Sequence, residues 1–119
     1  MTIDQLLSLP FSKIYPLLEA KAVRKGRTSE EVQNGVTWLT GYGSADVERM
    51  LADATTYGEF FLNAPKLNPD RKLITGNICG VRVEEIADPR MQEIRYLDKL
   101  IDELTKGRPM DKILRSQNP

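Results

Sequence analysis

The chain has 119 residues, of which 40% are hydrophobic and 29% are charged, and its 17 basic residues balance 17 acidic ones. These totals fit one globular domain and exclude a disordered chain, which would need lower hydrophobicity or a larger net charge. A net charge of zero also argues against nucleic acid as a partner, because phosphate contacts need an excess of Lys and Arg.

The residue types that most enzymes rely on are scarce. The chain has no histidine, which excludes Ser-His-Asp and Cys-His nucleophilic systems and His-ligated metals. Its single cysteine, Cys79, can form neither an internal disulfide nor a cysteine-based zinc site. We therefore expect no cofactor, no metal and no catalytic residue. Free cysteine is among the most buried residue types, so we expect Cys79 to be buried and inert, with Arg82 as the cation that would otherwise activate it.

No targeting or membrane segment is visible in the sequence. Residues 1–9 contain Asp4 and lack a basic region followed by an apolar stretch. The apolar runs are only a few residues long, whereas a bilayer span needs about 20. We expect a cytoplasmic protein with no membrane partner.

Capping signals predict two helices in the first third of the chain. Ser12 is a suitable N-cap, Pro16 falls in the first turn, and Gly26 follows the last apolar residue, which predicts a helix over about 13–25. Thr28 and Glu31 have the spacing of a capping box that opens a second helix. Gly41 ends it.

Two more helices are predicted before Pro65. Ser44 caps a third helix with apolar residues at helical spacing. Thr56 and Glu59 form another possible capping box, which opens a short fourth helix carrying Phe60, Phe61 and Leu62.

The stretch from Lys66 to Ala87 has the least regular pattern. Asn68 as cap and Pro69 at the first position predict a short helix that runs through Ile78 to Gly80. Val81 and Val83 then alternate with polar residues, as in a strand, but no second run of this kind exists to pair with them. We expect an irregular connection around 79–87.

The strongest helical pattern begins at Asp88 and Pro89 and ends before Gly107. The apolar face of this helix consists of Ile94, Leu97, Leu100, Ile101 and Leu104. This face is either part of the core or a dimer seam, and because it spans fewer than three heptads, we favour the core. On the other side we expect two i,i+4 ion pairs, Lys99 with Glu103 and Asp102 with Lys106. Pro109 starts a last short helix.

Taken together, these elements predict the fold class. We expect an all-α protein, a compact orthogonal bundle of about five to seven short helices. It forms a single domain over 1–119 with flexible ends at about 1–8 and 116–119.

Several stretches resemble a family of small bacterial proteins, domain of unknown function 2200. They include Phe11-Ser12-Lys13-Ile14-Tyr15-Pro16-Leu17, Lys25-Gly26-Arg27-Thr28, Trp38-Leu39-Thr40-Gly41-Tyr42, Leu67-Asn68-Pro69, Leu73-Ile74-Thr75-Gly76, Cys79-Gly80-Val81-Arg82-Val83-Glu84-Glu85-Ile86, Ile94-Arg95-Tyr96-Leu97-Asp98-Lys99-Leu100-Ile101-Asp102-Glu103-Leu104 and Lys112-Ile113-Leu114-Arg115. The resemblance covers nearly the whole chain after the first ten or so residues. It implies a mainly α orthogonal bundle and implies no activity.

One segment gathers polar residues on an irregular connection, where binding sites often lie. The speculative binding residues there are Asn68, Arg71, Thr75, Arg82 and Glu84. The alternative interpretation is helix capping and surface solvation. Glu84 and Glu85 are adjacent, so they point to different faces and do not suit an acid–base pair.

A second polar cluster joins the first two predicted helices and consists of Lys21, Arg24, Lys25 and Arg27. A helix–turn–helix reader is conceivable, but Glu30 and Glu31 would present the wrong sign to phosphates. We interpret the cluster as a solvated helix terminus.

Two hypotheses on function follow. The first is a small non-enzymatic interaction module, which binds an unknown protein partner or itself through a helical groove. It predicts an exposed apolar patch. The second is a small-molecule binder or modest enzyme that uses the polar residues of 68–85, and it predicts a pocket where they converge.

Overall fold

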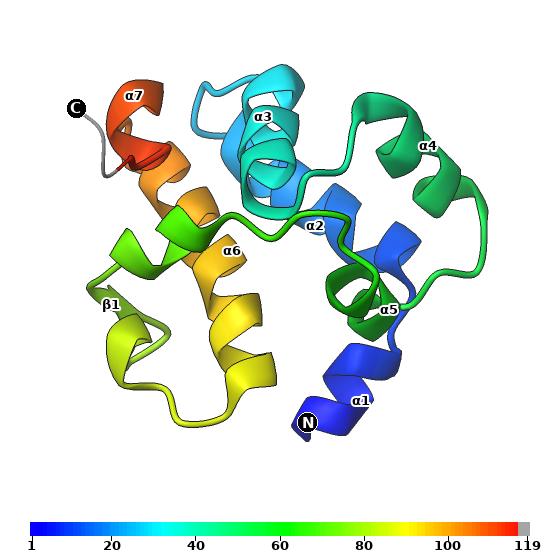
Figure 1. The fold of residues 1–119 in the computed structure, drawn as a ribbon. Helices are drawn as coiled ribbons and strands as arrows, with labels where there is room; N and C mark the ends of the chain where they lie inside the picture. The colour runs from blue at the N-terminus through cyan, green and yellow to red at the C-terminus, as the bar shows by residue number, and fades with distance from the viewer. Residues whose placement is uncertain (117–119) are drawn as a thin grey trace.

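The computed structural model describes residues 1–116, and helices account for most of them, as Figure 1 shows. The helical elements are α1 (Ile3–Ser8), α2 (Phe11–Val23), α3 (Ser29–Thr40), α4 (Ser44–Ala52), α5 (Tyr57–Leu62), α6 (Pro89–Thr105), α7 (Met110–Ile113) and the 3-10 helices η1 (Pro69–Leu73) and η2 (Val83–Glu85). The other regular elements are the strands β1 (Asn77–Ile78) and β2 (Val81–Arg82). The all-α prediction is confirmed.

Short polar motifs define two of the helix starts that the sequence predicted, whereas Ser44, predicted as a cap, is the first residue of α4 and follows the N-cap Gly43. Thr28 Oγ1 accepts the Glu31 amide (3.1 Å), and Glu31 Oε1 accepts the Thr28 amide (3.0 Å). Thr56 and Glu59 repeat this reciprocal capping at α5. These bonds satisfy amides that have no partner inside the helix, which fixes where α3 and α5 begin.

The first residues form a helix that the sequence analysis did not predict. We expected residues 1–8 to be a flexible end, but Thr2 and Gln5 make a capping box and open α1. Glutamine replaces the more familiar glutamate at the third position, and the motif works in the same way. The expected flexible end at 116–119 falls largely on 117–119, which lie outside the described residues.

The predicted start of α2 was two residues too late. The helix begins at Phe11, directly after Pro10, so Ser12 lies inside it. The Phe11 amide donates to the Thr55 carbonyl (2.9 Å). This tertiary bond replaces the side-chain cap that sequence reasoning assigned to Ser12. Pro16 therefore lies beyond the first turn of α2.

The connection around 79–87 contains a hairpin rather than only irregular chain. η1 ends at Leu73, so the helix predicted to continue through Ile78 is wrong. β1 and β2 pair in antiparallel fashion, with Ile78 opposite Val81, around the two-residue turn Cys79-Gly80. Both turn residues have positive φ (51° and 81°), as a type I′ turn requires. The partner strand was too short to show alternation in the sequence.

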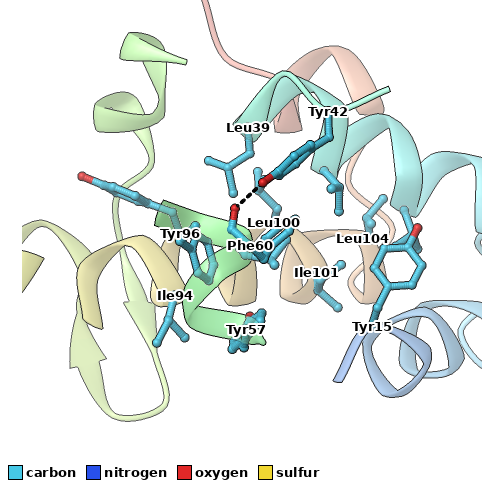
Figure 2. Close-up of a cluster of buried hydrophobic side chains, with 14 of the residues drawn as sticks. Tyr15, Leu39, Tyr42, Tyr57, Phe60, Ile94, Tyr96, Leu100, Ile101 and Leu104 are labelled. Carbon is cyan, nitrogen blue, oxygen red and sulfur yellow. Dashed lines mark hydrogen bonds between the residues drawn. The ribbon is translucent and has the colours of Figure 1, made fainter. Parts of the chain in front are cut away.

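The core is organised around α6, as Figure 2 shows. The predicted apolar face is buried in full, with Ile94, Leu97, Leu100, Ile101 and Leu104 each at most 1% exposed, so it is intramolecular core and not a dimer seam. Phe60 of α5 stacks on Phe11 and Tyr42. The Tyr42 hydroxyl donates to the Phe60 carbonyl (2.8 Å).

One of the two predicted ion pairs on α6 is wrong. Lys106 pairs with Asp102 (3.0 Å) as expected, but Glu103 turns into the protein and binds Arg108 and Arg115 instead of Lys99. Lys99 lies 3.7 Å from Asp102 and donates to the Asn77 carbonyl. Within residues 1–116, none of the helices is both long and apolar enough to span a bilayer.

Candidate functional site

The five residues predicted to bind a ligand do not converge on one site. Asn68 Oδ1 accepts the Asp70 amide (2.9 Å) and so caps η1. Arg71 Nε donates to both carboxylate oxygens of Glu93 (3.0 Å each), which ties η1 to α6. Asn68 therefore acts as a cap, as in the alternative interpretation, whereas Arg71 bridges two elements, a role that the sequence analysis did not foresee.

The other three predicted residues lie on the hairpin and beside it. The pKa of Glu84 is lowered mainly by a hydrogen bond from its own backbone amide. The Gly76 amide, which donates to Glu84 at 3.0 Å, lowers it further. Arg82 lies 4.0 Å from Glu85, and Thr75 is exposed. Arg82 lines a pocket of about 660 Å³, whereas Asn68 lines a separate pocket of about 360 Å³.

The thiol of Cys79 belongs to the Arg82 pocket, and its expected burial is wrong. The two-residue turn places Cys79 at the exposed tip of the hairpin. The nearest cation is Arg95, whose Nη1 lies 3.2 Å from Sγ, rather than Arg82. Sequence reasoning missed this neighbour because Arg95 lies on α6, sixteen residues away.

Arg95 also contacts Asp98, a half-buried carboxylate, at 2.8 Å. Burial raises the pKa of Asp98, and the nearby Arg95 and Lys21 offset this only in part. The folded protein therefore holds the Asp98 proton more tightly than the unfolded chain does. Stability from this group is fully present below the unfolded pKa of about 3.9 and is lost as the pH rises through the higher folded pKa.

We expect Asp98→Asn to raise the melting temperature near neutral pH, because the amide removes the cost of a buried charge. The gain should vanish at about pH 3, where Asp98 is protonated in both states. Thermal unfolding followed by circular dichroism at both pH values measures it. A variant that melts lower than the parent at neutral pH would show instead that the Arg95 pair dominates.

An apolar groove lies where α1, α5 and the start of α6 meet, and these elements can be followed in Figure 1. It encloses about 480 Å³, and we call it the α1/α5/α6 groove. Its lining consists of Leu7, Gly58, Glu59, Phe61, Leu62, Pro89, Arg90 and Glu93. Leu62 is 83% exposed, so the apolar lining of the groove continues into a side chain that meets water.

The sequence of α5 explains why Leu62 reaches solvent. Phe60, Phe61 and Leu62 are consecutive, and neighbouring residues on a helix differ by about 100° in direction. Phe60 is fully buried and Phe61 nearly so, which directs Leu62 away from the core. Three consecutive apolar residues on a short helix were the sequence signal for this surface, and the sequence analysis did not use it.

Backbone contacts hold α1 against α5. The Tyr57 amide donates to the Leu9 carbonyl (2.8 Å), and Pro10 bridges to Thr56. Gly58 permits the close approach, because a Cβ there would lie 3.1 Å from the Leu7 carbonyl oxygen. The wall of the groove that contains Leu7 depends on this glycine.

We expect Gly58→Ala to loosen α1 while leaving global stability nearly unchanged. The methyl crowds Leu7, but alanine favours the helix by about 1 kcal/mol, so the two effects offset each other. Hydrogen exchange measures the difference as faster exchange of the α1 amides. Gly35→Ala is the control, since a Cβ there meets nothing within 4 Å. Unchanged α1 exchange in Gly58→Ala would contradict this packing argument.

The mouth of the groove is acidic. Arg90 Nη1 donates to Asp4 (3.0 Å) and its Nη2 contacts Asp88 (3.4 Å), and these bonds bridge α6 to α1. The bond from Arg90 is the largest cause that lowers the pKa of Asp88, so Asp88 is ionised at neutral pH. Two carboxylates, Glu59 and Glu93, line the groove, and two more, Asp4 and Asp88, contact its lining residue Arg90. The two guanidinium groups paired with them, those of Arg71 and Arg90, offset two of these four negative charges.

Comparisons with known proteins place the chain in a family. Among curated proteins, none matches the sequence. A solved structure titled "Crystal structure of uncharacterized protein SP1917" is 49% identical, covers 96% of this chain and 93% of its own, and superposes with a TM-score of 0.89. Residues 5–115 match the family described as "Uncharacterized protein conserved in bacteria (DUF2200)". The chain therefore belongs to this family, as the sequence resemblance indicated.

Proposed function

We propose that the protein is a non-enzymatic interaction module whose α1/α5/α6 groove binds an amphipathic helix of a partner. The observation that carries the proposal is the exposed Leu62 at an apolar groove of about 480 Å³. Apolar surface of this kind is costly in water unless a partner covers it. Helices bind such grooves through apolar residues on one face.

The charges around the groove specify the partner further. Four carboxylates against two guanidinium groups leave an acidic excess, which favours a helix with Lys or Arg beside its apolar residues. Glu59 can best accept a bond from a partner. Its Oε1 accepts the Thr56 amide, but no ion pair within residues 1–116 uses its Oε2. A cytoplasmic location would suit such a protein-binding role.

The proposal is tested with a fluorescent synthetic helix that carries leucines on one face and lysines beside them. We expect Leu62→Lys to weaken its binding at least about tenfold, because one leucine contact is lost and a repelling charge is added. Fluorescence anisotropy measures the affinity. Val81→Lys is the matched control, since it places the same charge at an exposed apolar position outside the groove.

Two outcomes would contradict the proposal. One is equal loss of binding in Leu62→Lys and Val81→Lys, which would reflect overall charge. The other is equal affinity for a peptide in which glutamates replace the lysines. Binding of the basic peptide should also weaken at about 1 M salt, where the Debye length falls to about 3 Å.

A second candidate is a small-molecule site in the Arg82 pocket. The supporting observation is that Arg82, Arg95 and Cys79 line one pocket of about 660 Å³ with Ile86 and Met91. Two guanidinium groups beside an apolar wall suit an anion with an apolar part, which would compete with Glu85 for Arg82 and with Asp98 for Arg95. Native mass spectrometry of freshly purified protein tests it. A retained small molecule that is lost in Arg82→Ala would favour this candidate over the groove.

A further inference from the structure

The chain carries on α2 a surface of the kind that the groove would bind. Leu17 is 64% exposed at the middle of this helix. Lys13 and Lys21 lie four residues to either side of it, and Arg24 follows seven residues later, so all of them share the helix face of Leu17 or border it. We call this surface the α2 face, formed by Lys13, Leu17, Ala20, Lys21 and Arg24, all of which are exposed.

We propose that a second copy of this chain inserts its α2 face into the α1/α5/α6 groove. This inference rests on the proposed function of the groove and names its occupant. The α2 face is an amphipathic helix surface with a leucine between basic residues, which is the chemistry that the groove favours. Leu17 would contact Leu7, Phe61 and Leu62 across the interface.

Charge supports this pairing over a symmetric pairing of groove with groove. The α2 face carries three cations and no carboxylate, whereas the groove has an acidic excess. Two grooves facing each other would bring like charges together, which disfavours that contact. A chain whose net charge is zero can carry two surfaces of opposite charge in this way.

The contact is head-to-tail, because the two surfaces belong to different elements. A pair joined by one such contact keeps an unused groove on one copy and an unused α2 face on the other, so association continues beyond a dimer unless a ring closes. One helix face on one small groove makes a limited interface, so we expect reversible association that increases with protein concentration.

The test uses two full-length variants, each with one surface disabled. Leu17→Glu replaces the central leucine of the α2 face by a carboxylate, and Leu62→Lys disables the groove. Both positions are exposed, and circular dichroism confirms folding before use. Analytical ultracentrifugation at low salt measures the mass of the wild type, of each variant and of their equimolar mixture.

We expect the wild type to increase in mass with concentration, while each variant alone associates at least about tenfold more weakly. The mixture should form one-to-one pairs, because an intact groove on one chain meets an intact α2 face on the other. At about 1 M salt, the pairs should dissociate.

Three results would overturn the inference. One is a wild type that stays monomeric at all concentrations, and another is a Leu17→Glu chain that associates like the wild type. The third is a mixture without pairs. None of them decides the proposed function, since the synthetic peptide tests the groove without a second copy. If the peptide binds while the chain stays monomeric, the groove has a different occupant.

Discussion

Replacing Glu103 by alanine is expected to lower the free energy of unfolding by about 3–5 kcal/mol, because it removes the carboxylate from a buried ion network and leaves its arginines unpaired. Glu103 is buried on α6, and both oxygens are used. Arg115 donates to Oε1 (2.9 Å) and Oε2 (2.6 Å), and Arg108 donates to Oε2 (2.9 Å). The variant leaves the Arg115 guanidinium, whose side chain is 13% exposed, without its carboxylate.

The same network attaches α7 to the rest of the domain. Arg27 extends it by donating to the Arg108 carbonyl (2.9 Å) and to Glu31 (2.7 Å). Ile113 of α7 is buried, so release of this helix would expose core. Urea unfolding followed by circular dichroism measures the loss.

Arg108→Ala is the matched control for Glu103→Ala. The Arg108 side chain is 43% exposed, so its pair is screened by solvent and should contribute no more than about 1 kcal/mol. A loss of less than about 1 kcal/mol in Glu103→Ala would contradict the structural role given to the network.

The same substitution at two leucines should destabilise the protein strongly at one position and hardly at all at the other. Leu104→Glu is expected to lower stability by at least about 4 kcal/mol, roughly 15 °C in melting temperature, because it buries an unpaired charge in the core. Leu17→Glu should change stability by no more than about 0.5 kcal/mol, because surface substitutions rarely do more. Leu104 is 1% exposed and Leu17 is 64% exposed.

Differential scanning calorimetry of both variants measures the contrast. An undiminished melting temperature in Leu104→Glu would show that the apolar face of α6 is not the core. A large loss in Leu17→Glu would show that the α2 face packs within the molecule.

The helices were predictable where a local motif fixes the chain. Thr28 with Glu31, Thr56 with Glu59, and Asp88 with Pro89 act within one helical turn, so the sequence contains the whole signal. The start of α2 was misplaced, because the bond from Phe11 to Thr55 joins segments far apart in the chain.

Side-chain partners were harder to predict than helices. Glu103 has the spacing for a pair with Lys99, yet burial selects two arginines that follow α6. Cys79 was expected inside because free thiols are usually buried, but a two-residue turn places it at the surface. In both cases the tertiary arrangement decides, and sequence spacing does not report it.

The candidate groove also depends on tertiary arrangement. Its residues come from α1, α5 and α6, and Leu7 is separated from Pro89 by most of the chain. The predicted binding residues from Asn68 to Glu84 were instead chosen as neighbours in sequence. The structure uses Asn68, Arg71 and Glu84 in capping and bridging contacts, and their role in ligand binding stays a prediction.

The central claim is that the α1/α5/α6 groove is a binding surface for a basic amphipathic helix. Two-dimensional amide NMR of the labelled protein, titrated with the leucine–lysine peptide, tests it most directly. We expect the largest chemical-shift changes at the amides of Gly58, Leu62 and Arg90, and unchanged amide signals in the Cys79 hairpin. Shifts that concentrate at the hairpin, or no shifts at saturating peptide, would contradict the claim.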